Sequence, residues 1–185
     1  MSDGLAWFNA LPRDDAERRL YFCFANRPWA VAVAGARPYQ DVDELLAAAE
    51  SAWANLAPPD WLESFAAHPR IGERGGDSPA SSEREQALLR QAPTETLAAL
   101  AAENRRYEAR FGHVFLIAAA GRSPDEILAT LRRRLNNAPD EELAVASGEH
   151  RKITRLRLER LLDEPHPPAS RDLPRSARGS QRSGK

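Results

Sequence analysis

One feature limits the fold of this chain more than any other: only one run of residues is apolar enough to form a buried strand. That run, from Val114 to Ala120, has no equally apolar segment with which to pair in a sheet. The chain is instead rich in alanine (33 residues) and leucine (21 residues), which favour helices, while valine and isoleucine are sparse. We therefore predict an all-α fold, in which the run itself is either a buried strand-like segment or a helical turn.

Capping residues and prolines mark several helix boundaries. The patterns Asp-Val-Asp-Glu at 41–44 and Ser-Pro-Asp-Glu at 123–126 are typical of helix N-termini. One helix is expected to run from Thr94 to the residue before Gly112, and another from Pro139 to about Asp163. Residues 31–34 alternate like a strand, but their two alanines favour a helix. At this length we expect a single compact multi-helix domain over residues 1–163.

The last part of the chain, residues 164–185, differs from the rest. It is rich in proline, serine and arginine, and it carries five basic side chains against two acidic ones. Such a segment buries little apolar surface, so we predict a disordered tail. A basic tail could touch nucleic acid, but a solvated terminus is the more common outcome.

Charge and cysteine content exclude several classes of protein. The net charge of −1 gives no strong field to attract nucleic acid, and no run of 18 apolar residues could span a membrane. The single Cys23 cannot form an internal disulfide, and the four histidines lack metal-ligand spacing. The N-terminal residues are unlike a signal or transit peptide, so we expect a reducing, cytoplasmic location.

His68 is the first candidate for chemistry. It follows a predicted helix and is followed by Pro69 and then a glycine-rich loop, which would hold its side chain at an edge. A histidine there could face a cleft and titrate near neutrality as a general acid or base. The alternative is a surface histidine that caps the helix.

Ser82, Glu85 and Gln86 form a second candidate group. Ser-x-x-Glu is itself a capping box, which explains the pattern without any function. If this helix N-terminus pointed at the His68 loop, its free N–H groups could bind a polar or anionic ligand. Glu85 could then orient the imidazole of His68 and raise its pKa by charge pairing.

Arg157 is the third candidate, because it shares an apolar helical stripe with Ile153 and Ala146. An arginine that faces inward requires an anion or a cluster of carbonyl groups, since an unpaired buried charge is costly. The alternative is an arginine whose stem lies along the edge of the core while its head stays in water.

Taken together, the order of these motifs resembles one family. The matching residues extend over about 5–163 and comprise Arg37-Pro38-Tyr39, Trp53, Trp61-Leu62, His68-Pro69-Arg70-Ile71-Gly72, Ser82, Glu85-Gln86, Tyr107, Phe111-Gly112, 115–119, Gly121-Arg122-Ser123, Arg134-Leu135, Asn137, Glu141, Glu149, Ile153 and Arg157-Leu158. This set is similar to the 2-oxo-4-hydroxy-4-carboxy-5-ureidoimidazoline (OHCU) decarboxylases of the urate-to-allantoin pathway. One departure is His113-Val114, where the family often has an apolar residue and proline.

The resemblance implies a helical fold particular to this family, a homodimer, and decarboxylation of OHCU to (S)-allantoin without a metal or organic cofactor. It implies His68 as the catalytic acid/base with Glu85 beside it. Around the ureide substrate it implies Pro69, Ser82, Glu85, Gln86, Phe115, Leu116, Ile117, Ala118, Ala119 and Arg157. Two alternatives stay open: another cofactor-free lyase or hydrolase acting on a ureide, and a non-catalytic helical interaction module.

Overall fold

A computed structural model of the chain describes residues 3–71 and 92–164. These residues contain eight helices and no strand, which confirms the predicted all-α class. The helices are α1 (Asp3–Ala10), α2 (Arg13–Phe24), α3 (Arg27–Gly35), α4 (Val42–Ala54), α5 (Pro58–Ala66), α7 (Thr94–Phe111), α8 (Pro124–Arg134) and α9 (Pro139–Asp163). The predicted tail, residues 164–185, lies outside the described residues except for Glu164, the C-cap residue of α9, and the Ser82–Gln86 segment also lies outside them.

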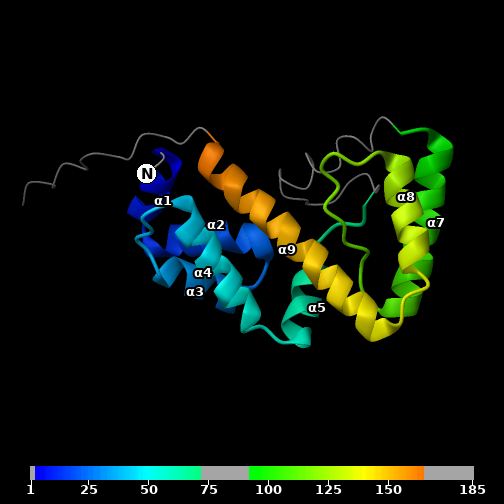
Figure 1. The fold of residues 1–185 in the computed structure, drawn as a ribbon, viewed down its shortest axis with the longest axis horizontal. Helices are drawn as coiled ribbons and strands as arrows, with labels where there is room; N and C mark the ends of the chain where they lie inside the picture. The colour runs from blue at the N-terminus through cyan, green and yellow to red at the C-terminus, as the bar shows by residue number, and fades with distance from the viewer. Residues whose placement is uncertain (1–2, 72–91, 165–185) are drawn as a thin grey trace, which may run out of the picture.

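The long helix α9 connects two groups of helices. Figure 1 shows α9 crossing the molecule from α7 and α8 at one end to α1–α4 at the other, with α5 beside its middle. The C-terminal half of α9 contributes Leu158 and Leu162 to a core built from α1–α4. A second core lies between α7, α8 and the segment after α7. Phe65 of α5, Leu116 and Ala146 of α9 form a small cluster between the two.

The predicted helix signals work as expected from the sequence. The Asp41 side chain accepts a hydrogen bond from the backbone N–H of Glu44 at 2.8 Å. Ser123 and Glu126 form a reciprocal capping box at the start of α8. Helix α7 ends at Gly112, whose φ of 76° is readily adopted by glycine. Residues 31–34 lie inside helix α3, as predicted.

The apolar run after Gly112 is neither a strand nor a helical turn. Residues 114–119 form an irregular, largely buried segment. Buried backbone outside regular structure must find hydrogen-bond partners elsewhere, and here side chains provide them. Arg134 donates to the carbonyl of Leu116 at 2.7 Å, and Glu149 accepts from the N–H of Ala118 at 2.9 Å. The run therefore packs like a core strand but depends on α8 and α9 for its hydrogen bonds.

The Arg37-Pro38-Tyr39 motif is structural in this protein. The Arg37 guanidinium donates to the carbonyls of Phe8 at 2.7 Å and Leu11 at 3.0 Å, and so closes the end of α1. The buried Tyr39 hydroxyl donates to the carbonyl of Val33 at 2.6 Å, and burial raises the pKa of Tyr39 to about 12. This part of the resemblance therefore reflects packing of the N-terminal helices.

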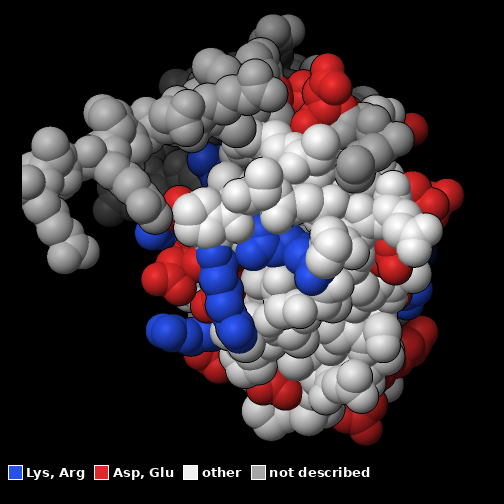
Figure 2. All heavy atoms as spheres, turned by 90° about the vertical axis from the view of Figure 1, so that its left-hand side faces the viewer, with Lys and Arg blue, Asp and Glu red and all other residues white. Residues whose placement is uncertain are grey.

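Surface charge on the end formed by α1–α4 is mixed. Figure 2 shows basic side chains grouped across the middle of this face, with acidic side chains toward its margins. This distribution agrees with the near-neutral net charge of −1.

None of the helices in the described residues is both long and apolar enough to cross a membrane.

Candidate active site

His68 lies on a turn that is fixed to two helices. Its backbone N–H donates to the carbonyl of Phe65 at 3.0 Å, which closes the last turn of α5. Three residues later, the buried side chain of Asn104 on α7 donates to the carbonyl of Ile71 at 2.9 Å. Pro69, between them, is half-buried. The turn is therefore held at both ends, and the His68 side chain is only 9% exposed.

The imidazole of His68 contacts a second buried histidine. Its Nε2 lies 2.8 Å from Nε2 of His150, a fully buried residue on α9. The His150 ring stacks on Phe24 with a centroid separation of 4.6 Å and meets the edge of Phe65 at 5.3 Å. These rings hold His150 in place from the α2 and α5 sides.

Arg157 lies about two helical turns after His150 on α9. It is only 6% exposed, and its Nη1 donates to the carbonyls of Phe22 and Cys23, each at 3.5 Å. Of the two readings of the sequence, the inward-facing arginine that meets a cluster of carbonyl groups is correct. Its charge also acts on the histidine pair, since it lowers the pKa of both His68 and His150.

Both histidines are held in the neutral form. Burial, followed by the positive charge of Arg157, lowers the pKa of His68 to about 3. Burial, His68 and Arg157 together hold the pKa of His150 well below its ordinary value. The expectation that His68 titrates near neutrality therefore does not hold among the described residues. Glu85, expected to raise the pKa of His68, lies outside them.

These depressed pKa values predict a loss of stability in mild acid. An unfolded histidine has a pKa of about 6.5, so between pH 6.5 and pH 3 the unfolded chain binds more protons than the folded one. Stabilisation is thus complete above about pH 6.5 and falls as pH drops toward 3. For His68 alone the loss by pH 5 is about 2 kcal/mol, and His150 acts in the same direction. The difference between the free energies of unfolding in urea at pH 7.5 and at pH 5 measures this loss.

The control for this experiment is the double variant His68→Asn, His150→Phe, which has neither titrating ring. Its stability should change less between the two pH values than that of the wild type. An equal pH dependence in the two proteins would show that the histidine pair does not titrate as described.

The predicted substrate-binding segment Phe115–Ala119 reaches the same region. Leu116 packs with Phe65, one turn before His68, and with Ala146, one turn before His150. Leu116 of this segment therefore lies within one helical turn of both histidines, and Arg157 follows His150 on the same helix. Ser82, Glu85 and Gln86 lie outside the described residues, so their predicted places beside His68 stay predictions.

A buried ionic network of Arg134 and Glu142 also holds the Phe115–Ala119 segment in place, through the bond from Arg134 to the carbonyl of Leu116. The Glu142 carboxylate on α9 is fully buried and accepts hydrogen bonds from the Arg134 guanidinium, at 2.8 Å from Nε and 2.5 Å from Nη2. It also accepts from the Tyr107 hydroxyl and, at 2.7 Å, from the Asn137 amide. Burial and the bond to Glu142 raise the pKa of Tyr107 well above its ordinary value. Arg134 is thereby oriented toward the segment that it supports.

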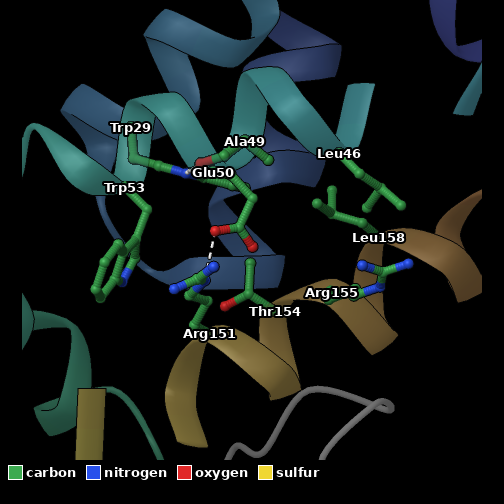
Figure 3. A pocket seen from close by; sticks show the side chains of 9 residues that line it. All are labelled: Trp29, Leu46, Ala49, Glu50, Trp53, Arg151, Thr154, Arg155 and Leu158. Atoms are coloured by element: carbon green, nitrogen blue, oxygen red, sulfur yellow. Dashed lines mark hydrogen bonds and ion pairs between the residues drawn. The ribbon is translucent and has the colours of Figure 1, made fainter. Parts of the chain in front are cut away.

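Two cavities lie away from His68. One of about 360 Å³ lies beside α8 and α9 and is lined by Ile117, Arg122, Thr130, Arg133, Arg134, Asn137, Glu141, Val145 and Glu149. Of the predicted site residues it contains only Ile117. The second, shown in Figure 3, lies between α3, α4 and α9 next to the Glu50–Arg151 ion pair. Its volume of about 20 Å³ has room for about one water. Neither cavity is lined by a predicted catalytic group.

The described residues contain no group of three or more histidine, cysteine, aspartate or glutamate side chains placed to hold a metal ion.

Comparison with known proteins identifies the family. A model of the OHCU decarboxylase family matches residues 9–159. The chain belongs to the OHCU decarboxylase family. It is 34% identical over 141 residues to the OHCU decarboxylase of Haloferax volcanii. The matched region covers 73% of this chain and 82% of the relative. A uric acid degradation bifunctional protein of Arabidopsis thaliana is 35% identical over 65% of this chain, which spans only 40% of that relative.

The fold of the OHCU decarboxylase family is also found by structural comparison. A crystal structure of an OHCU decarboxylase in the presence of (S)-allantoin matches with a TM-score of 0.68 and 32% identity. The match covers 78% of this chain and 96% of that one. The motif resemblance thus extends to the arrangement of the helices.

Among the described residues of this region, His150 is a buried histidine that the motifs did not predict, although its spacing along α9 indicates an inward-facing position. It lies four residues after Ala146, three before Ile153 and seven before Arg157, and so shares the buried stripe of α9 that was used to place Arg157. The motifs that carry the resemblance to the OHCU decarboxylase family do not include His150.

Proposed function

We propose that this chain decarboxylates OHCU to (S)-allantoin, with His68 as the acid/base. The observation that carries the proposal is the family match together with the position of His68. A neutral imidazole sits where α5, α9 and the Phe115–Ala119 segment meet, close to the buried charge of Arg157. A solved relative crystallised in the presence of (S)-allantoin supports the same substrate class.

Decarboxylation of OHCU requires the protein to position the substrate and to transfer a proton. Loss of CO₂ from a carbon next to a C=N bond leaves an electron pair that the C=N bond can accept, so the substrate supplies its own electron sink. The protein must then orient the C–CO₂ bond and deliver a proton to one face of the ring. A placed histidine typically contributes a factor of about 10²–10⁴ to such proton transfers. His68, held at both ends of its turn, meets the requirement for placement.

The remaining predicted residues have proposed roles around the substrate. Arg157 supplies a fixed positive charge for the anionic ureide, and residues 115–119 supply backbone groups. Pro69 shapes the turn beside His68. Ser82, Glu85 and Gln86 are proposed to complete the site from the 72–91 segment, with Glu85 orienting His68.

Circular dichroism of freshly generated OHCU tests this function. We expect the protein to accelerate the appearance of one enantiomer of allantoin, because a proton delivered from a fixed group reaches one face of the ring. Loss of OHCU without release of CO₂ would instead indicate a different lyase or hydrolase acting on ureides. An unchanged rate would indicate a helical interaction module.

We also propose that the chain is a homodimer in the cytoplasm. The resemblance implies the dimer, and the side chains of Tyr21 and Phe22 on α2, 45% and 56% exposed, offer apolar surface for it. Cys23 is buried and is the single cysteine of the sequence, so it forms no internal disulfide, which suits a reducing compartment. Light scattering during size-exclusion chromatography tests the oligomeric state.

A further inference from the structure

The contact between His68 and His150 assigns a role to a residue outside the family motifs. The two Nε2 atoms are 2.8 Å apart, which is a hydrogen-bond distance. Both rings are buried, and their planes are nearly perpendicular at 88°. A hydrogen bond between two imidazoles requires one ring to donate its Nε2–H and the other to accept with a lone pair.

Only one proton occupies this contact. Two imidazolium rings would each have a hydrogen on Nε2, so the nitrogens would repel rather than bond. Burial and the nearby Arg157 guanidinium disfavour a charge on either ring, and Arg157 is the charged group of the described residues that acts on both. Each ring therefore carries a single proton, and one of the two rings donates it to the other.

The surroundings of Nδ1 of His150 indicate that His150 is the donor. Its Nδ1 is buried and has no hydrogen-bond partner among residues 3–71 and 92–164. If the proton of His150 were on Nδ1, a buried N–H would be left unsatisfied, which is rarer in folded proteins than an unsatisfied acceptor. The arrangement with the proton on Nε2 of His150 leaves only a lone pair without a partner.

We infer that His150 is a positioning residue that donates its Nε2–H to Nε2 of His68 and thereby holds His68 in the tautomer protonated at Nδ1. The inference rests on the proposed function in one respect only, namely that His68 is the acid/base. His68 then presents a proton donor, not a lone pair, to an anionic ligand in the free enzyme. Phe24 and Phe65 keep the donor aimed, because they pack against the ring of His150 on two sides.

The tautomer can be measured directly in the free protein. With ¹⁵N-labelled histidine, a protonated ring nitrogen and a bare one resonate far apart, and the chain has only four histidines. We expect His68 to show a protonated Nδ1 and a bare Nε2, with its signals assigned by their loss in His68→Asn. The opposite pattern would overturn the inference. This result does not depend on any activity, so it separates the inference from the proposed function.

Two variants test the effect on catalysis. His150→Phe keeps an aromatic ring between Phe24 and Phe65 but removes the donor. We expect kcat to fall about 10–100-fold with little change in KM, as for partners that orient a functional histidine. The NMR signals of His68 should shift toward a mixture of tautomers. His150→Gln places an amide N–H near the former Nε2, so it should recover much of the lost rate.

Tyr39→Phe is the matched control, because it removes a buried donor whose hydrogen bond is to the Val33 carbonyl and not to a histidine. It should lower stability but leave kcat unchanged. Wild-type kinetics in His150→Phe, or an equal loss of rate in His150→Phe and His150→Gln, would overturn the role assigned to the His150 donor. If His150→Phe fails to fold, the tautomer measured in the wild type still decides.

Discussion

His68→Asn is expected to lower kcat for OHCU decarboxylation by about 10²–10⁴ while KM changes little. Asparagine is polar and fits within the space of the imidazole, with its amide near the former Nδ1 and short of His150 on α9. It has no ring nitrogen that could exchange a proton with the bound substrate. The substrate should therefore still bind, but no group would deliver a proton to one face of the product ring.

The measurement is the circular dichroism signal of allantoin at several OHCU concentrations, which gives kcat and KM separately. A rate reduced to the uncatalysed level should come with loss of the enantiomeric excess, since proton delivery from solvent has no reason to favour one face. Thermal unfolding of the variant shows whether the fold survives. A wild-type rate in His68→Asn would mean that His68 is not the acid/base.

The local signals of the sequence predicted the helices well. The capping residues Asp41 and Ser123, the prolines that start helices, and Gly112 act through neighbours within four residues, so their patterns can be read without a structure. The apolar run after Gly112 was harder. Its conformation is determined by Arg134 and Glu149, which are far away in sequence, and periodicity carries no information about them.

The site residues likewise differ in how much of their structure the sequence could predict. That Arg157 faces inward could be predicted from the stripe that it shares with Ile153, but its carbonyl partners on α2 could not. His68 was found from its motif, whereas its hydrogen-bond partner is 82 residues away on α9. Its lowered pKa depends on burial and on a distant charge, two quantities that only the folded chain defines.

The largest effect on stability is expected at Glu142, even though it is no part of the proposed chemistry. Its carboxylate is fully buried and is the counter-ion of Arg134, which is only 4% exposed. Glu142→Gln keeps the shape of the side chain but leaves the guanidinium charge without compensation in the interior. Breaking a buried pair in this way costs about 3–5 kcal/mol, a large share of the stability of a typical domain.

Urea unfolding at pH 7.5 measures this cost, provided that the dependence on urea concentration keeps the same slope. The exposed pair of Arg13 and Glu17 on α2 is the matched control. Glu17→Gln removes the same charge by the same substitution, but water replaces the lost partner, so the expected cost is about 0–1 kcal/mol. A similar loss in the two variants would mean that burial of the Glu142 pair adds nothing to its importance.

A double variant separates the charge from the packing. In Arg134→Met, Glu142→Leu both ions are replaced by apolar side chains, so no unpaired charge remains. We expect it to be more stable than Glu142→Gln. It should nevertheless fall short of the wild type, because Arg134 also donates to the carbonyl of Leu116, which would lose its partner. Since Leu116 belongs to the proposed substrate-binding segment, the double variant should bind substrate more weakly, with a higher KM, even where its stability is recovered.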